Sequence, residues 1–302
     1  MKIRLVCYED PNLWILGKFA KNLENNLKKI GYNVDIDSVP DPNADINHHI
    51  IFSDYNGKIN NCDTLMITHV DNIDKLNNLK KNLEYARLGI CMSSETMHML
   101  IQKGISKEKL CYILPAHDEK VLMNKIVIGI FCRVQPDGRK REYFLDKLSK
   151  QLNSEIFKFI IMGDSWDNQV NNLISNGFEV DYYESFESEK YYSFFKDLNY
   201  YLYMGLDEGQ MGVIDAHAAG VDTIVTSQGY HLDLDGTVTH PFTSYDELKE
   251  ILLKIQNHKL KIIDSVTTYK WYDYTIKHLE CWKFLLGNKS INSNYKDGLN
   301  TI

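Results

Sequence analysis

The sequence contains no uninterrupted apolar run near 18 residues, so nothing in it predicts a membrane-spanning helix. It also lacks an excess of positive charge, because 41 Asp and Glu outnumber 34 Lys and Arg and give a formal charge of -7. A protein that follows a phosphate backbone normally carries a basic face, so we expect no nucleic-acid partner. Residues 1–6 enter an apolar strand without a signal stretch, and we therefore expect a soluble, cytoplasmic protein.

Cysteine is also sparse. The six cysteines are widely spaced, form no Cys-x-x-Cys motif and lie mostly within apolar runs. This pattern is typical of buried, reduced thiols and argues against a disulfide framework or a zinc site. We expect no metal and no bound cofactor.

What the sequence does contain is a repeated alternation of strands and helices over 302 residues, a length that favours two domains. In the first half, strands at 3–7, 33–36, 47–52, 64–68, 88–92 and 110–114 alternate with helices. The second half restarts with strands at 126–131 and 157–162 and continues with strands from 180, at 200–204 and at 222–226, and with helices at 143–152 and 245–256. The alternation predicts an α/β fold of two Rossmann-like, doubly wound domains that face a cleft.

We place the first domain at residues 1–120 and the second at 121–269. An aromatic-rich helix at 269–286 follows, and we expect the segment of about 270–302 to cross back to the first domain.

The segment 203–220 carries the strongest indication of chemistry. Ligands of a parallel sheet bind beyond the carboxyl ends of its strands. Here a strand ends in Asp207 and Glu208, and the turn Gly209-Gln210-Met211-Gly212 then opens a helix. Glycines let the backbone approach a ligand, and the N–H groups and dipole of a helix N-terminus suit a diphosphate. The carboxylates fit sugar hydroxyls, since carboxylate oxygens only accept hydrogen bonds.

Seven residues separate Asp207 from Asp215, and Ala216-His217-Ala218-Ala219-Gly220 follows. This segment resembles the signature of retaining GT-B glycosyltransferases of family 4, in which two acids at this spacing precede Ala-Met-Ala-x-Gly. The resemblance implies that the first acid contacts the donor sugar and that the second holds the nucleotide ribose. We carry these roles to Asp207 and Asp215, with Glu208 as the alternative first acid.

Two further segments resemble motifs of the same family in the same order. Arg133, followed by Lys140 or Arg139, is similar to the family's Arg and Lys that bind the diphosphate, and guanidinium groups suit phosphate oxygens. The strand at 157–162 with Gly163 resembles the strand and glycine beside the nucleotide base.

In the first half, Thr68-His69 resembles the strand end whose histidine points at the donor sugar. His48 and His49 are alternatives for that histidine. The resemblance makes the first domain the acceptor side and the second the nucleotide-sugar side.

These observations lead to one functional hypothesis and two alternatives. The chain is expected to be a hexosyltransferase-like, metal-independent glycosyltransferase that moves a sugar from a nucleotide-sugar to an acceptor hydroxyl with retention. The acceptor, whether glycan, lipid-linked or protein, is open. The alternatives are a sugar-nucleotide epimerase of the same architecture and a non-catalytic nucleotide-sugar-binding partner subunit.

Two surface features have simpler interpretations. His231, Asp233 and Asp235 could suggest a metal site, but they alternate along an extended segment, and His217 is expected to be packed within a helix. Seven lysines could lie against an anionic membrane, but solvated helix faces are the better explanation. We expect at most a weak membrane-surface contact and a peripheral place at the inner membrane face. The lysines are Lys18, Lys21, Lys28, Lys29, Lys75, Lys80 and Lys81.

Overall fold

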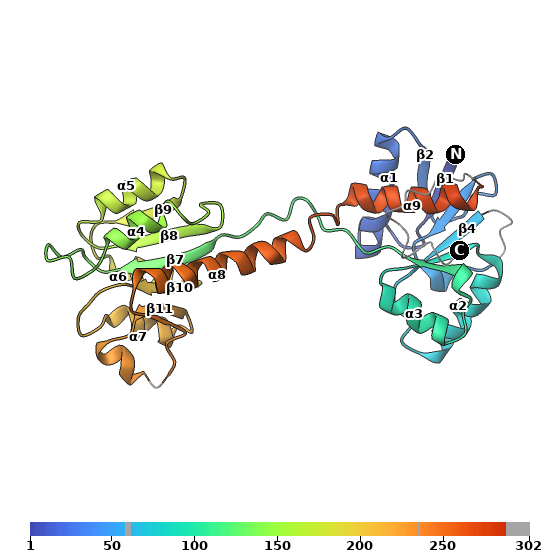
Figure 1. The fold of residues 1–302 in the computed structure, drawn as a ribbon. Coiled ribbons are helices and arrows are strands. Elements are labelled where there is room, and N and C mark those ends of the chain that lie inside the picture. The colour runs from blue at the N-terminus through green and yellow to red at the C-terminus, as the bar shows by residue number, and fades with distance from the viewer. Residues whose placement is uncertain (58–61, 235, 288–302) are drawn as a thin grey trace. The chain divides into compact units, whose positions relative to one another are not determined.

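The computed structural model describes residues 1–57, 62–234 and 236–287, and these divide into two compact units. One unit comprises Met1–Val121 together with the described chain from Val266 to Gly287, and the other is Leu122–Ser265. Each unit has its own six-stranded parallel sheet with helices around it (Figure 1). The α/β class with two Rossmann-like, doubly wound domains is therefore confirmed.

The sheet of the first unit has the strand order β2-β1-β3-β4-β5-β6, and all of its strand pairs are parallel. Its strands are β1 (Lys2–Val6), β2 (Asn33–Asp37), β3 (Ile46–His49), β4 (Cys62–Ile67), β5 (Leu88–Cys91) and β6 (Leu110–Tyr112). Its helices are α1 (Ile15–Lys29), α2 (Ile73–Tyr85), α3 (Ser94–Gln102) and α9 (Trp271–Leu285), with 3₁₀ turns η1 (Phe52–Asp54) and η2 (Lys107–Lys109).

The last helix of the described chain is part of the first unit. On α1, apolar residues at helical spacing, among them Leu23 and Leu27, are fully buried, and each contributes roughly 1.5–3 kcal/mol of burial free energy. Trp271 and Trp282 of α9 belong to the same core, and the rings of Phe19 and Trp271 meet edge to face at 5.2 Å. The expected return of the C-terminal helix to the first domain is confirmed up to Leu285, while residues 288–302 lie outside the described part.

The sheet of the second unit has the order β12-β11-β10-β7-β8-β9, again with parallel pairs throughout. Its strands are β7 (Ile126–Phe131), β8 (Phe157–Met162), β9 (Glu179–Tyr183), β10 (Tyr200–Tyr203), β11 (Asp222–Thr226) and β12 (His240–Phe242). Its helices are α4 (Tyr143–Leu148), α5 (Asp167–Ser175), α6 (Ser188–Phe194), α7 (Met211–Ala218) and α8 (Tyr245–Asp264), with the 3₁₀ turn η3 (Gly229–Asp233). The chain adds β8 and β9 on one side of β7 and then β10, β11 and β12 on its other side, so the strand order reverses between β7 and β10. Such a switch point is where an open α/β sheet binds its ligand.

Several element boundaries differ from the prediction. The strand expected at 47–52 ends at His49, because the chain turns there and Phe52 is buried in η1 with its carbonyl accepting a hydrogen bond from Asn82. The helix expected to reach residue 152 ends at Leu148. Helix α5 and strand β12 were not expected: α5 has a largely polar sequence, and β12 has only three residues and contains Pro241.

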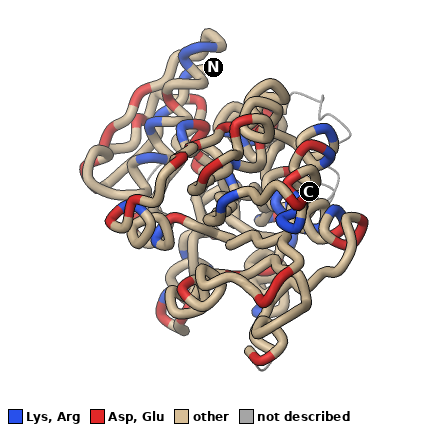
Figure 2. Tube along the Cα trace, turned by 90° about the vertical axis from the view of Figure 1, so that its left-hand side faces the viewer, with Lys and Arg blue, Asp and Glu red and all other residues tan. Residues whose placement is uncertain are grey.

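No helix in the described ranges is long and apolar enough to cross a membrane. Acidic and basic residues are interspersed along the described chain (Figure 2).

Candidate functional site

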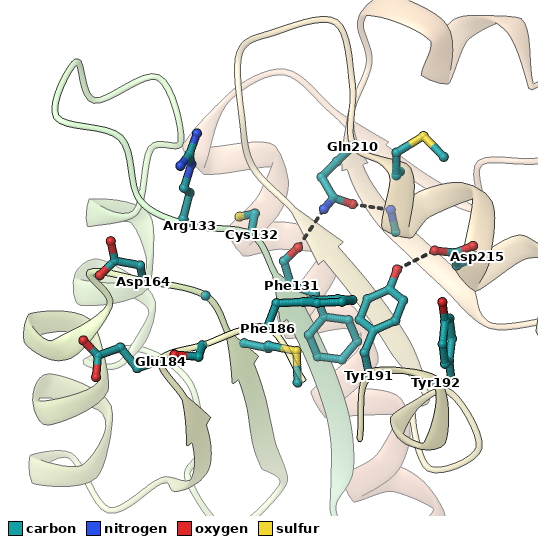
Figure 3. A pocket seen from close by; sticks show the side chains of 15 residues that line it. Phe131, Cys132, Arg133, Asp164, Glu184, Phe186, Tyr191, Tyr192, Gln210 and Asp215 are labelled. Carbon is teal, nitrogen blue, oxygen red and sulfur yellow. Dashed lines mark hydrogen bonds between the residues drawn. The ribbon is translucent and has the colours of Figure 1, made fainter. Parts of the chain in front are cut away.

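A pocket of about 870 Å³ lies in the second unit at the carboxyl ends of β7, β8 and β9, beside the N-terminus of α7. Figure 3 shows side chains from these separate segments around one space. Among the predicted site residues, Arg133, Gly163, Gln210, Met211, Gly212 and Asp215 line it. Its place beside the β7–β10 switch point is the one expected for a ligand site in this kind of sheet.

Gln210 joins α7 to the end of β7. It is the N-cap of α7, and its Oε1 accepts hydrogen bonds from the Gly212 N–H at 2.5 Å and the Tyr201 hydroxyl at 2.7 Å. Its Nε2 donates to the carbonyl of Phe131 at 2.6 Å (Figure 3). An added Cβ on Gly212 would lie 2.2 Å from the Tyr201 hydroxyl, so the close packing here depends on glycine. The N-terminus of α7 is thereby fixed at the rim of the pocket.

Asp215 lies on α7 and is held by a tyrosine. The Tyr191 hydroxyl, from α6, donates to Oδ2 of Asp215 at 2.5 Å (Figure 3). Burial and this carboxylate both raise the pKa of Tyr191, so its hydroxyl remains a donor at neutral pH. The free lone pairs of Asp215 can accept hydrogen bonds from the vicinal hydroxyls of a ribose.

Arg133 is an exposed cation at the edge of the pocket. It follows the end of β7, and it makes no ion pair with any residue in the described ranges. Gly163 lies next to its backbone, just past the end of β8, with φ at +144°, and a Cβ there would lie 2.2 Å from the Cys132 carbonyl oxygen and 2.9 Å from the Arg133 N. Glycine therefore allows β8 to pass close to β7 beside Arg133.

Asp207 does not line the pocket and lies in the loop after β10, where Lys140 and Tyr203 hold it. Lys140 Nζ lies 2.6 Å from Oδ2, and the Tyr203 hydroxyl donates to Oδ1 at 2.5 Å. Burial raises the pKa of Asp207, but the hydrogen bonds from Lys140 and Tyr203 outweigh burial and hold the pKa below its usual value. Lys140 is thus engaged with a carboxylate, whereas Arg139 is exposed and pairs with Asp137.

Glu208, the alternative first acid, differs from Asp207 in its environment. Its side chain is exposed, and its carbonyl accepts a hydrogen bond from the Tyr230 N–H at 3.0 Å. Gly209, with φ at +120°, packs against the ring of Tyr230. Of the two acids, Asp207 is the one linked to a predicted phosphate-binding lysine.

The three candidate histidines all belong to the first unit. His69 is exposed beyond the end of β4 and lines a separate pocket of about 240 Å³. His48 and His49 are completely buried in β3, where His48 contacts the Thr64 hydroxyl and His49 contacts that of Tyr8. His69 is therefore the one of the three whose imidazole is open to a ligand.

The described ranges hold no group of three or more His, Cys, Asp or Glu side chains placed to bind a metal ion. Asp35 and Asp37, which are spaced like a metal-binding Asp-x-Asp pair, each form an ion pair with Arg4. Asp235, the third residue of the metal-like pattern, lies outside the described part. His217 is packed as expected, with Nε2 3.1 Å from the Thr223 hydroxyl.

Sequence reasoning missed the tyrosine partners of both acids, Tyr191 and Tyr203. It also missed Arg141, which is buried at a φ of +50° and donates to the carbonyls of Met204 and Thr243. Arg141 fixes the loop before α4 against the end of β10. The one available signal was the run of basic residues at 139–141, which does not show which of them turns inward.

The sequence matches no protein-family model, and no curated protein is similar to it in sequence. Similar solved structures include HepE of Anabaena in complex with UDP and glucose, at 12% identity over 94% of this chain and 100% of HepE, with a TM-score of 0.37. The lipopolysaccharide outer core galactosyltransferase WaaB is 14% identical over 95% of this chain and 100% of its own, with a TM-score of 0.39. A glycosyltransferase from Rickettsia africae is 13% identical over 95% and 99%, with a TM-score of 0.38. The fold assignment rests on the strand order of each unit.

Proposed function

We propose that the chain is a glycosyltransferase that transfers a sugar from a nucleotide diphosphate sugar to an acceptor hydroxyl with retention. The observation that carries this proposal is the pocket of the second unit, where an arginine without an ion pair among the described residues, a fixed helix N-terminus and the oriented carboxylate of Asp215 surround one space. These are the groups that a nucleoside diphosphate requires.

In the proposed complex, the diphosphate lies between Arg133 and the N-terminus of α7. The ribose lies at Asp215, which Tyr191 orients, and the base extends along the ends of β8 and β9 toward Gly163 and Phe186. An aromatic ring such as that of Phe186 offers a surface for stacking of a base.

Asp207 and Lys140 are proposed to act next to the pocket, at the donor sugar and the departing phosphate. A positive side chain and a helix N-terminus stabilise the charge that develops on a leaving diphosphate, and stabilisation of this kind often contributes more to catalysis than any other effect. Since Arg133, Lys140 and α7 supply it, the proposal requires no metal. His69, the exposed candidate histidine of the first unit, is proposed as a catalytic residue.

Two measurements test the proposal. A thermal-shift panel of UDP-, GDP-, ADP-, CDP- and dTDP-sugars should show one nucleotide family that raises the melting temperature, because a ligand bound only by the native state stabilises it. Slow release of nucleoside diphosphate from that donor then separates an enzyme from a non-catalytic binder. A sugar-nucleotide epimerase would instead convert the donor to its epimer without releasing the nucleotide. If no member of the panel binds, the proposal fails.

A further inference from the structure

His231 is buried beneath the loop that carries the predicted donor-binding residues. It lies in η3, is 3% exposed, and forms one hydrogen bond with each of its two ring nitrogens. Nε2 lies 3.1 Å from the backbone N of Gln210, and Nδ1 lies 3.0 Å from the carbonyl oxygen of Thr226 at the end of β11.

These two partners determine which nitrogen carries the proton. The Thr226 carbonyl can only accept, so Nδ1 must be protonated, and the Gln210 N–H can only donate, so Nε2 must have a free lone pair. The imidazole is therefore the neutral Nδ1–H tautomer. A protonated ring would place an N–H against the N–H of Gln210 and lose that bond.

The bond matters because of what Gln210 does. Its side chain caps α7 through Gly212 and ties the helix to the Phe131 carbonyl, so the position of its backbone governs the rim of the pocket. His231 fixes that backbone from below. The histidine is thus one link in a chain of contacts from β11 through Gln210 to the N–H groups at the start of α7.

We propose that neutral His231 is a positioning residue for the donor loop, and that its protonation releases Gln210 and weakens nucleotide binding. The consequence for binding rests on the proposed function, whereas the structural switch does not. No charged side chain in the described ranges hydrogen-bonds the ring, whose two partners are backbone groups.

The groups that face His231 from its packed neighbours are mostly neutral. The rings of Tyr203 on β10 and Tyr230 on η3 meet it edge to face at 5.7 and 5.2 Å. Beyond Tyr203 lie the Asp207 carboxylate and Lys140, and beyond Thr226 lies the guanidinium of Arg141, 2.7 Å from the Thr226 hydroxyl. A carboxylate therefore lies beyond one side of the ring and a guanidinium beyond the other, and neither touches it.

The structural part is tested on the ligand-free chain by NMR of the histidine side chains and the backbone amides. We expect His231 to be the Nδ1–H tautomer at neutral pH, and the Gln210 amide to shift as His231 titrates. In His231→Gln, which keeps one donor and one acceptor but does not titrate in this range, the Gln210 amide should not follow pH. His240→Gln, in β12, is the control for loss of an unrelated histidine. An Nε2–H tautomer, or a His231 that stays neutral down to acid unfolding, would overturn the proposal.

The functional part is tested by calorimetric titration of the nucleoside diphosphate that binds best, one pH unit above and one below the His231 midpoint. The terminal phosphate of the ligand itself titrates at about pH 6, so wild type is compared with His231→Gln at each pH. We expect the wild-type affinity to fall about fivefold more than that of the variant, because one lost hydrogen bond weakens binding to the protonated form about tenfold and some neutral His231 remains at the lower pH. Equal pH dependence in both proteins contradicts a positioning role. Absence of binding at any pH refutes the proposed function and leaves the NMR result to decide the switch.

Discussion

Tyr203 donates its hydroxyl hydrogen to Asp207 at 2.5 Å, four residues further along the chain. Gly205 between them makes this possible, since a Cβ there would lie 2.3 Å from the Tyr203 hydroxyl. Lys140 completes the arrangement on the other carboxylate oxygen. Asp207 is therefore held in one orientation by its own protein. A carboxylate that is already oriented needs little reorganisation when the transition state forms.

Substitution of the two acids, Asp207 and Asp215, should affect nucleotide binding and turnover differently. Asp215→Asn should weaken free nucleoside diphosphate and nucleotide-sugar alike, because both carry the ribose. Asp207→Asn should leave free diphosphate binding nearly unchanged and lower turnover, since its proposed contact exists only with the sugar. The loss of binding free energy in Asp215→Asn and of transition-state stabilisation in Asp207→Asn should each be roughly 1.5–3 kcal/mol. Titration calorimetry measures the first and donor turnover the second.

Glu208→Gln is the matched control for this pair, because Glu208 is adjacent but exposed. It should behave like wild type. If Glu208→Gln lowers turnover without weakening binding of free nucleoside diphosphate, and Asp207→Asn has no effect, Glu208 is the first acid of the motif. If none of the three changes affects binding or turnover, this loop is not the donor site.

Arg133→Ala should lose roughly 2–4 kcal/mol of transition-state stabilisation, the range found when a charge-stabilising donor is removed. The reason is that Arg133 is the exposed cation at the pocket and has no ion pair among the described residues. The change is measured as kcat/KM for donor turnover. Arg139→Ala, in the same loop but paired with Asp137, should have little effect. If kcat/KM falls equally in both variants, the loss reflects the lower positive charge of the loop and not a specific contact of Arg133.

Gly212→Ala should disturb the N-terminus of α7. Its Cβ would lie 2.2 Å from the Tyr201 hydroxyl and 2.6 Å from Oε1 of Gln210, so the cap must move. Overpacking of this kind costs roughly 1–3 kcal/mol, and nucleotide affinity should fall together with stability. Ala218→Ser, at the exposed last turn of the same helix, should leave both unchanged. If Gly212→Ala binds nucleotide as strongly as wild type, the N-terminus of α7 is not part of the nucleotide site.

Much of this site follows from the sequence because it lies at strand ends. Apolar runs followed by Arg133, Gly163 and the segment 210–215 predict which residues meet at the pocket, since the carboxyl ends of parallel strands share one edge, whereas Asp207 lies outside it. The hydrogen-bond partners of these residues cannot be predicted from the sequence, because the bonds join distant positions. Examples are Tyr191 with Asp215 and His231 with Gln210. Tyrosines with core-like spacing give no sign of which one turns its hydroxyl to a carboxylate.

The first unit should lose stability in mild acid. Burial lowers the pKa of His278 to about 4, against an ordinary value of about 6.5 in the unfolded chain. The unfolded state therefore binds more protons between these values, and the free energy of unfolding falls as the pH falls through that window, by about 3 kcal/mol in total. Buried His48, whose pKa is also lowered by burial and by His278, should add to the slope.

His278→Asn should flatten this pH dependence, because asparagine can still bond the Tyr274 carbonyl but does not titrate. Urea unfolding at several pH values between 4 and 7, followed by tryptophan fluorescence, measures the slope. His98→Asn, at an exposed position on α3, is the control. A slope that is identical in all three proteins would mean that His278 is accessible to protons in the folded state.

Donor turnover should survive excess EDTA, because Arg133, Lys140 and the N-terminus of α7 are proposed to carry the diphosphate charge. The assay is release of nucleoside diphosphate after dialysis against chelator. Complete loss of turnover, restored by manganese or magnesium, would contradict a metal-independent mechanism.

The central claim is that a nucleotide-sugar is bound and cleaved in the pocket of the second unit. Its most direct test is the release of nucleoside diphosphate from the donor that the panel selects, measured in wild type, Arg133→Ala and Arg139→Ala. The account predicts slow release by wild type and by Arg139→Ala, and at least a tenfold loss in Arg133→Ala, since each 1.4 kcal/mol lost is a factor of about ten. Donor that binds but is never cleaved, or cleavage at an equal rate in all three proteins, would contradict it.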